Sequence, residues 1–376
     1  MQDVSPSESA DLGLEPLAPQ ELEPGLWRIP MPLPFPLHSA NAYLLRGDGA
    51  GGGTDEGWLL VDAPLATAQA LDAFAAGLDA AGARPEDITA LVLTHAHPDH
   101  IGTLGRWQRR SGAPVHLLGR EAHLMAALWD DPTHAAFLEA AHALARHGMP
   151  GDEAQRLVTQ AAELRGMLEP PAHVTPIAHG QRLRLAGGHY HAVWTPGHAD
   201  GHLCLLRDDG LFLAGDHALP GMLPTIGRYP WSRPDPVGDH LGALAAVATL
   251  PVRLVLSGHG QPYTDLRARA NELQGAHIRQ TAAVARLLAE SGAAVDAYEL
   301  AGRLYAARWR HAQSRLFAMA EMVARLEHLR ALGRAERLAA SDGAVTYARA
   351  TEALGPDITS AWQNDAASQP EQQASA

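Results

Sequence analysis

One ten-residue stretch constrains the fold of this chain more than any other. Residues 91–100 read Leu-Val-Leu-Thr-His-Ala-His-Pro-Asp-His, an apolar run followed at once by four candidate metal ligands, His95, His97, Asp99 and His100. The apolar run is typical of a buried strand, so the four ligands are expected at its carboxyl end. Bringing four such side chains together is costly unless a cation binds there. We therefore expect a metal site, and two ions are the working hypothesis.

Three later segments can complete such a site, because two ions need more donors than one loop provides. Each segment has the same order, which is an apolar strand-like run, a small residue or glycine, and then a candidate ligand. A glycine beside a ligand lets the backbone turn sharply and approach an ion without a clash from Cβ. The candidate ligands in these segments are His198, Asp216 and His259.

The pattern His-x-His-x-Asp-His, followed by single His, Asp and His residues, resembles the metallo-β-lactamase superfamily. The resemblance runs from about residue 27 to 263 and continues more weakly to about residue 350. The ordered set of ligands is a strong signal, whereas any single histidine among the 21 in the chain carries little information. Carried over position by position, the resemblance places His95, His97 and His198 on one metal and Asp99, His100 and His259 on the other, with Asp216 bridging them.

The resemblance also implies the fold class, an α/β protein built as a four-layer αββα sandwich. An opening hairpin is predicted around a glycine-rich turn at 47–53. Asp62 at its end is expected to hydrogen-bond a ligand imidazole or, alternatively, to cap the next helix. Residues 121–169 show helical spacing between two strands. This helical insertion is interpreted as a lid that sets substrate specificity, with a packing or dimerisation element as the alternative.

Four segments are expected along the chain. Residues 1–24 form a flexible lead-in and 25–265 the metallo-β-lactamase-fold domain. Residues 266–352 read as three helices and a hairpin, which resemble the winged-helix appendage of some superfamily members, and 357–376 are expected to be disordered. Residues 277–350 hold 11 arginines against 7 acidic residues. This excess is small, so a packing or dimerisation module is favoured over nucleic-acid contact, and a homodimer is one expected assembly.

Composition excludes several classes of protein. All 29 basic residues are arginines, so the chain has neither a Schiff-base lysine nor a phosphate-loop lysine. The formal net charge of −13 argues against broad, charge-driven nucleic-acid binding. The single cysteine, Cys204, excludes an intrachain disulfide and is expected to be a small buried side chain. No apolar stretch long enough for a membrane span and no secretory signal pattern appear, so a cytoplasmic location is expected.

The expected chemistry is hydrolysis by a hydroxide held between two divalent ions. Zinc is the expected metal, and iron and manganese suit the same imidazole and carboxylate donors. Asp99 is expected to orient the hydroxide and shuttle its proton. His217 and Tyr263 are candidates for assisting the leaving group or the oxyanion, and packing is the alternative role for both.

The ligand set narrows the substrate class. By the same resemblance, zinc β-lactamases of the commonest type carry a cysteine where this chain has Asp216. Hydrolysis of β-lactams is therefore not the expected role. The pattern is shared by glyoxalase II-like thioesterases, lactonases and nucleases, and the chain most resembles the lactamase-β-2-like group. We expect a small acyl substrate, and a thioester first, because a thiolate leaves without a strong general acid.

Two alternatives to an acyl substrate remain. An endoribonuclease would need a positively charged track for phosphates, which only arginines such as Arg279, Arg308 and Arg310 could supply. A non-enzymatic winged-helix protein that uses the metal as a sensor is the weaker alternative. Structural zinc sites are usually closed and rich in cysteine, unlike this set of histidines and aspartates.

Overall fold

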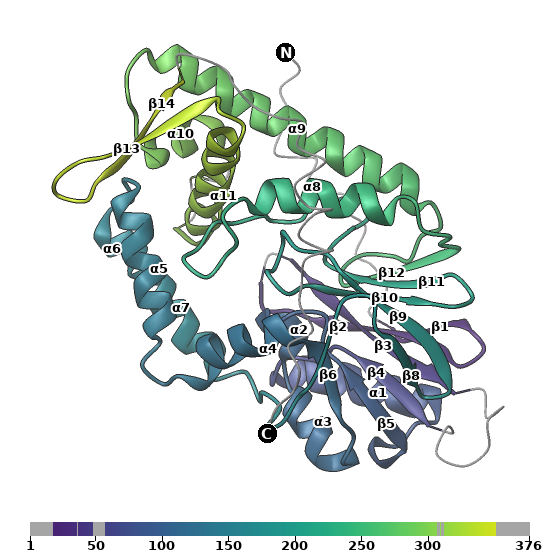
Figure 1. Ribbon diagram of the computed structural model, residues 1–376. Helices are drawn as coiled ribbons and strands as arrows, with labels where there is room; N and C mark the ends of the chain where they lie inside the picture. Colours follow the sequence, from purple (N-terminus) through teal and green to yellow (C-terminus); the bar gives the residue numbers. More distant parts are fainter. Residues whose placement is uncertain (1–17, 36, 48–56, 307–308, 310–311, 351–376) are drawn as a thin grey trace, which may run out of the picture.

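The computed structural model describes residues 18–35, 37–47, 57–306, 309 and 312–350 (Figure 1). Most of the N-terminal lead-in, most of the glycine-rich turn at 47–53 and the tail expected at 357–376 lie outside the described residues.

The first sheet has seven strands whose spatial order follows the sequence. Its first four strands pair antiparallel, and the last three are added in parallel. The strands are β1 Gln20–Glu23, β2 Leu26–Pro32, β3 Ser39–Arg46, β4 Trp58–Val61, β5 Ile88–Val92, β6 Val115–Leu118 and β7 Thr175–Ile177.

The second sheet has five strands in the order β12-β11-β10-β9-β8. Its pairs are antiparallel except β11 with β12, which is parallel. The strands are β8 Arg182–Leu185, β9 Gly188–Trp194, β10 Leu203–Arg207, β11 Leu211–Gly215 and β12 Leu254–Ser257.

Alternation of side chains along the first sheet creates two apolar layers. On β4, Trp58 and Leu60 belong to the core shared with helices α1 (Ala68–Ala81) and α3 (Leu104–Ser111). Leu59 and Val61 belong to the core between the two sheets. Because strand side chains point to opposite faces in turn, a continuous apolar run is what a strand buried on both faces requires.

The second sheet repeats this arrangement. On β11, Leu213 faces the core between the sheets, whereas Phe212 packs with helices α8 (Pro236–Val247) and α9 (Leu266–Ser291). Helices therefore cover the outer face of each sheet, with α8 and α9 above and α1 and α3 below in Figure 1. The predicted αββα architecture is confirmed.

A tight turn after β5 positions the first group of candidate ligands. Pro98 opens the short helix α2 (Pro98–Ile101), which ends at Gly102 with φ of 33°. A Cβ at Gly102 would lie 2.2 Å from the Pro64 carbonyl oxygen, so the close approach of these two segments requires glycine. Asp99 and His100 consequently lie in a single helical turn at the end of the strand.

The predicted insertion is helical and connects two parts of the molecule. Leu128 and Trp129 pack in the core of the first sheet. Ala141 and Leu144 pack instead in a core shared with the C-terminal helices. The elements of the insertion are α4 Gly119–Met125, the π-helical turn Ala126–Asp130, α5 Ala135–Arg146, α6 Gly151–Ala154 and α7 Arg156–Arg165.

The C-terminal part contains α10 (Ala297–Leu304), α11 (Ala312–Ala331) and a hairpin of β13 (Ala335–Ala339) and β14 (Val345–Arg349). These elements lie where the sequence predicts them, and the winged-helix comparison stays a prediction. No described helix combines the length and apolarity that crossing a membrane requires.

Two expected boundaries differ from the structure. Gln20–Glu23 pairs with β2 as strand β1, so the flexible lead-in expected over 1–24 is wrong for this stretch. The boundary at 266 falls at the start of α9, whose Leu273 packs on the second sheet while its Leu288 packs with α10 and α11. One continuous helix thus belongs to both units, and the shared helix leaves no linker between them.

Candidate metal centre

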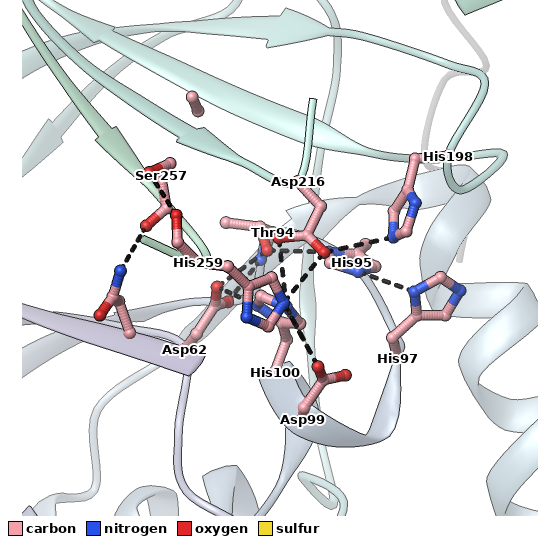
Figure 2. A network of polar contacts seen from close by, with 12 residues as sticks. Asp62, Thr94, His95, His97, Asp99, His100, His198, Asp216, Ser257 and His259 are labelled. Atoms are coloured by element: carbon pink, nitrogen blue, oxygen red, sulfur yellow. Dashed lines mark hydrogen bonds and ion pairs between the residues drawn. The ribbon is translucent and has the colours of Figure 1, made fainter. Parts of the chain in front are cut away.

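The structure brings all seven expected ligands to one place, where strands of the two sheets end side by side (Figure 2). Four of them come from the turn after β5, and the others follow β9, β11 and β12. In chain order they are His95, His97, Asp99, His100, His198, Asp216 and His259.

Asp216 lies at the centre of this group. Its Oδ1 is 3.4 Å from His100 Nε2, and its Oδ2 is 3.4 Å from His198 Nε2 and 3.3 Å from His259 Nε2. Asp99 Oδ2 lies 3.4 Å from His259 Nε2 on the far side. One carboxylate therefore reaches histidines that come from three different strand ends.

Three overlapping groups of side chains have ligand atoms close enough to hold a divalent ion. Within each group the atoms lie within 4.8 Å of one another. Two of the groups match the two sets implied by the sequence pattern, and the third joins them through Asp216. The groups are His95, His97 and His198; His95, His100 and Asp216; and Asp99, His100 and His259.

Three of the histidine rings, those of His100, His198 and His259, are held with Nε2 directed to the centre (Figure 2). The opposite nitrogen, Nδ1, donates to an oxygen in each case: His100 to Asp62 (2.8 Å), His198 to the Thr225 carbonyl (2.9 Å) and His259 to the Ser39 carbonyl (2.7 Å). The Nε2 atoms of these rings are buried without a hydrogen-bond partner among the described residues, as is Asp216 Oδ1. Buried polar atoms left open in this way, with the tautomer fixed from behind, fit a divalent metal.

The pKa values of the ligand side chains show that the centre is suited to a bound cation. Burial lowers the pKa of His97 to about 3, which leaves the neutral imidazole that binds metals. Burial also acts to lower the pKa of His259, but Asp216 and Asp99 raise it to about 10. Burial acts to raise the pKa of Asp216, yet His259 and His100 hold it well below its usual range. The carboxylates are thus anionic, and the site is suited to cations.

Asp62 supports the ligands from behind, as the sequence predicts. Its Oδ1 accepts the Thr94 backbone N–H at 2.9 Å, and its Oδ2 accepts the Thr94 hydroxyl at 2.9 Å and His100 Nδ1–H at 2.8 Å. The predicted hydrogen bond to a ligand imidazole is confirmed. Asp62 also has φ of 59°, a left-handed conformation that aspartate and asparagine tolerate better than most residues.

We expect Asp62→Asn to weaken metal binding by about 10- to 100-fold, the usual effect of losing a supporting carboxylate. Asparagine keeps the backbone conformation, but its NH2 group must face at least one of the N–H and O–H donors that the carboxylate now accepts. Competition with a chromophoric chelator measures the metal affinity. Asp72→Asn, an exposed aspartate on α1, is the matched control. Equal affinities in the two variants would show that Asp62 does not orient His100.

Two residues of the insertion hold the metal-ligand loop, although neither belongs to a recognisable sequence motif. The Glu121 carboxylate accepts the backbone N–H of Ala96 at 2.8 Å and that of Gly201 at 2.8 Å. Trp129 Nε1 donates to the Ala96 carbonyl at 2.7 Å. Glu121 thus ties the loop carrying His95 to the loop carrying His198. A lone glutamate far from both loops in sequence gives no pattern by which it could have been found.

His202 and Asn41 were also missed. His202 Nε2 accepts the backbone N–H of Asp216 at 3.0 Å. Asn41 donates from its amide nitrogen to the carbonyls of Ser257 and Gly260, at 3.0 and 2.9 Å, on either side of His259. Each side chain therefore holds the backbone of a ligand. His202 lies four residues after a candidate ligand and before an apolar strand, which is the one signal the sequence offered.

The structure places two expected catalytic residues outside the cavity beside the centre. His217 is fully buried, and burial lowers its pKa to about 3. The Tyr263 hydroxyl donates to the Ala218 carbonyl at 2.8 Å. Neither side chain lines the cavity beside the centre, so the geometry offers no support for a catalytic role of either. Cys204 is free and buried, as predicted.

A cavity of about 830 Å³ opens onto the candidate ligands. Its walls come from the insertion, the loop after β2, the segment between β11 and α8, and the start of α11. The ligands that line it are His97, Asp99, His198, Asp216 and His259. The centre is therefore accessible to a substrate on one side and closed by the two sheets on the other.

Comparison with known proteins agrees with this geometry. Residues 36–259, which include all seven candidate ligands, match the Metallo-beta-lactamase superfamily. The chain belongs to the metallo-beta-lactamase superfamily. Members of this superfamily are metallo-hydrolases, and the His and Asp groups of this chain could bind divalent metals for such chemistry.

Relatives within the superfamily cover most of the chain. The Bacillus subtilis (strain 168) protein named "Probable metallo-hydrolase YqjP" is 25% identical over 292 residues, which are 74% of this chain and 84% of the relative. The crystal structure of a metallo-beta-lactamase family protein from Thermus thermophilus is 34% identical and has a TM-score of 0.75. It covers 88% of this chain and 100% of that protein. A beta-lactamase domain protein from Burkholderia ambifaria is 25% identical with a TM-score of 0.74 over 88% of this chain and 94% of its own. The likeness to these structures therefore includes the C-terminal helices.

Proposed function

We propose that this protein is a hydrolase that uses two divalent ions, zinc first among the candidates, on an acyl substrate, and most readily on a thioester. The observation that carries the proposal is the set of buried Nε2 atoms of His100, His198 and His259. They have no hydrogen-bond partner among the described residues and lie 3.3 to 3.4 Å from the Asp216 carboxylate beside an open cavity. A closed structural site would have no such access. An open site with His and Asp donors is typical of catalytic metals.

Each residue of the centre has a distinct part in this proposal. When bound, the ions activate a water molecule and polarise the substrate carbonyl. The two histidine groups would hold one ion each, and the Asp216 carboxylate, which lies between the groups, would be shared by both ions. Asp99 lines the cavity with its side chain 18% exposed, so its carboxylate can orient the attacking water and hold the proton that the water gives up. A thiolate then leaves without further protonation.

The charges around the cavity favour an acyl substrate over RNA. No arginine is among the described residues that line it, and apart from the histidine ligands its ionisable side chains are carboxylates and the phenol of Tyr229. A nucleic-acid backbone requires neutralisation by cations. Of the arginines expected for a phosphate track, Arg279 is exposed on α9 and does not line the cavity. Arg308 and Arg310 lie outside the described residues.

Thiol release from a panel of thioesters tests the proposal. The metal-loaded protein is assayed with acyl-coenzyme A, acyl-glutathione and acyl-N-acetylcysteamine substrates, and in parallel with single-stranded RNA. We expect turnover of thioesters that stops with a chelator, and intact RNA. Cleavage of RNA without thiol release from any substrate would overturn the acyl assignment.

Asp99→Asn separates the role of Asp99 from metal binding in general. We expect kcat for the preferred thioester to fall by about 100- to 10,000-fold, the range for losing a positioned proton acceptor. Metal content measured on the same sample shows how much of the loss reflects a missing ion. Asp152→Asn, which alters an exposed aspartate on α6, is the control. If the Asp99→Asn variant keeps both metals and full kcat, Asp99 has no catalytic role.

A further inference from the structure

We infer that the substrate carries a large, uncharged, apolar group, and that this group lies between the insertion and the first turns of α11, with Phe317 as one wall. The inference rests on the proposed function for the scissile bond only. The presence of the apolar group follows from the cavity itself, so the two can fail separately.

The cavity is large and lined by hydrocarbon beyond the metal ligands. Its volume of about 830 Å³ falls in the range of sites that enclose a whole small molecule. The insertion contributes Leu124, Leu128 and Leu164 to one side, and the segment after β11 contributes Leu219 and Leu223 to another. Because removing apolar surface from water is the main driving force for binding in such a space, the preferred ligand is apolar and large enough to fill it.

Aromatic rings form a continuous part of this lining. The ring centroids of Trp129 and Phe137 are 5.3 Å apart, and those of Phe137 and Trp231 are 5.7 Å apart. Tyr229 stacks on Trp231 at 4.9 Å with an interplanar angle of 12°. All four residues line the cavity. Trp129 donates its Nε1–H to the Ala96 carbonyl beside the ligands, so its ring joins the aromatic wall directly to the metal centre.

Phe317 extends the wall to a helix that lies far from the ligand loop in the sequence. Its neighbours on α11, Leu316 and Ala318, are 2% and 0% exposed, whereas Phe317 is 43% exposed and lines the cavity. Because Phe317 lines the same cavity as the apolar side chains of the insertion, it adds to a contiguous apolar surface, which is the kind of patch that marks a binding site. The C-terminal unit thereby takes part in substrate selection.

Four carboxylates line the cavity away from the candidate ligands, and three of them are already engaged, while the fourth, Glu163, is exposed. Glu121 is engaged by two backbone N–H groups, and Asp239 pairs with Arg233 at 2.8 Å. Asp200 pairs with Arg120 at 3.4 Å and accepts the Arg233 backbone N–H at 3.1 Å. These arginines are thus held by carboxylates and do not line the cavity. An anionic group would meet only negative charge away from the metal centre, and a cationic group would find only the exposed Glu163 as a carboxylate that is not already engaged, so we assign an uncharged group to the apolar part of the cavity.

A binding experiment tests this inference without any turnover. Acetone, 2-hexanone and 2-octanone are titrated into the metal-loaded protein, and tryptophan fluorescence reports binding because Trp129 and Trp231 line the cavity. These ketones contain no bond that the enzyme can hydrolyse. We expect affinity to rise about fourfold for each added methylene group. Affinities that do not depend on chain length would overturn the inference.

Variants of Phe317 test its place in the wall. We expect Phe317→Ala to weaken 2-octanone binding by about tenfold and to leave acetone binding unchanged. Phe317→Trp, which narrows the space, should weaken 2-octanone more than 2-hexanone. Ile278→Ala is the matched control, because Ile278 is 58% exposed on α9 and does not line the cavity. Equal effects of Phe317→Ala and Ile278→Ala would remove Phe317 from the binding surface.

Two series of thioesters with chains of different length test whether the apolar group belongs to the substrate that is hydrolysed. One series varies the acyl chain on N-acetylcysteamine, and a second varies an alkyl thiol on acetate, so that the two series show which side of the scissile bond enters the cavity. A rise of kcat/KM with chain length in either series supports the inference. Turnover that is independent of chain length in both contradicts it while leaving the proposed function intact. If ketone binding depends on chain length but no thioester is turned over, the inference about the apolar cavity still holds, whereas the proposal that thioesters are the substrates is contradicted.

Discussion

Replacing Asp216 by asparagine is expected to lower metal content and activity together. The Asp216 carboxylate lies 3.3 to 3.4 Å from the Nε2 atoms of three histidines, and its Oδ1 is buried without a hydrogen-bond partner among the described residues. An asparagine amide is neutral and offers one oxygen, so it cannot bridge two cations. We expect activity to fall by at least about 100-fold, since even residues that only support a ligand have effects of about 10- to 100-fold.

Metal content of the purified Asp216→Asn protein, measured beside its activity, decides this prediction. Asp208→Asn changes the same functional group at an exposed position and is expected to keep wild-type metal content. Two ions retained at full activity in Asp216→Asn would contradict the bridging role. One ion retained with no activity would be consistent with it, because the second group of ligands remains.

Loss of Glu121 is expected to have the largest effect on stability. Glu121 is 1% exposed, and in Glu121→Ala the N–H groups of Ala96 and Gly201 would be buried without an acceptor. Each such group costs about 1–3 kcal/mol, so the free energy of unfolding should fall by about 2–6 kcal/mol. This loss is a large part of the whole free energy of unfolding of an ordinary domain, which is about 5–15 kcal/mol.

Urea denaturation in the presence of a chelator measures this loss without a contribution from bound metal. Glu139→Ala removes a glutamate from α5 of the same insertion that accepts no hydrogen bond from the ligand loops, and it should change stability little. If the two variants unfold at the same urea concentration, Glu121 does not connect the ligand loops. Metal affinity of Glu121→Ala should fall as well, because the loops that carry His95 and His198 lose their common anchor.

The effect of Glu121 on stability should also depend on pH. Burial raises the pKa of its carboxyl to about 7 from the ordinary 4.5, although the two backbone N–H groups act in the opposite direction. The unfolded chain therefore ionises at lower pH than the folded one. The contribution of Glu121 is fully present below about pH 4.5, declines up to about pH 7 and is constant above. Glu121→Ala should thus cost more stability at pH 5 than at pH 8, and the reverse order would contradict the raised pKa.

The sequence by itself determined the order of the strands and the candidate ligands. Apolar runs followed by glycine and a ligand are local patterns, and each strand end carries its ligand within a few residues. The helical insertion expected over 121–169 is present as helices α4 to α7. The place of Asp62 behind His100 could be expected because both lie at the ends of neighbouring strands β4 and β5.

The tertiary structure alone decided what surrounds those ligands. Glu121, Trp129 and Phe317 reach the centre or its cavity from helices whose local sequence is that of ordinary amphipathic helices. Their function depends on which faces of the insertion and of α11 meet across the cavity. Helical periodicity indicates that a face is apolar, but the partner it packs against is chosen by long-range packing of the whole chain. For that reason the chemistry of the centre could be predicted from the sequence, while the shape and charge of the space that selects a substrate could not.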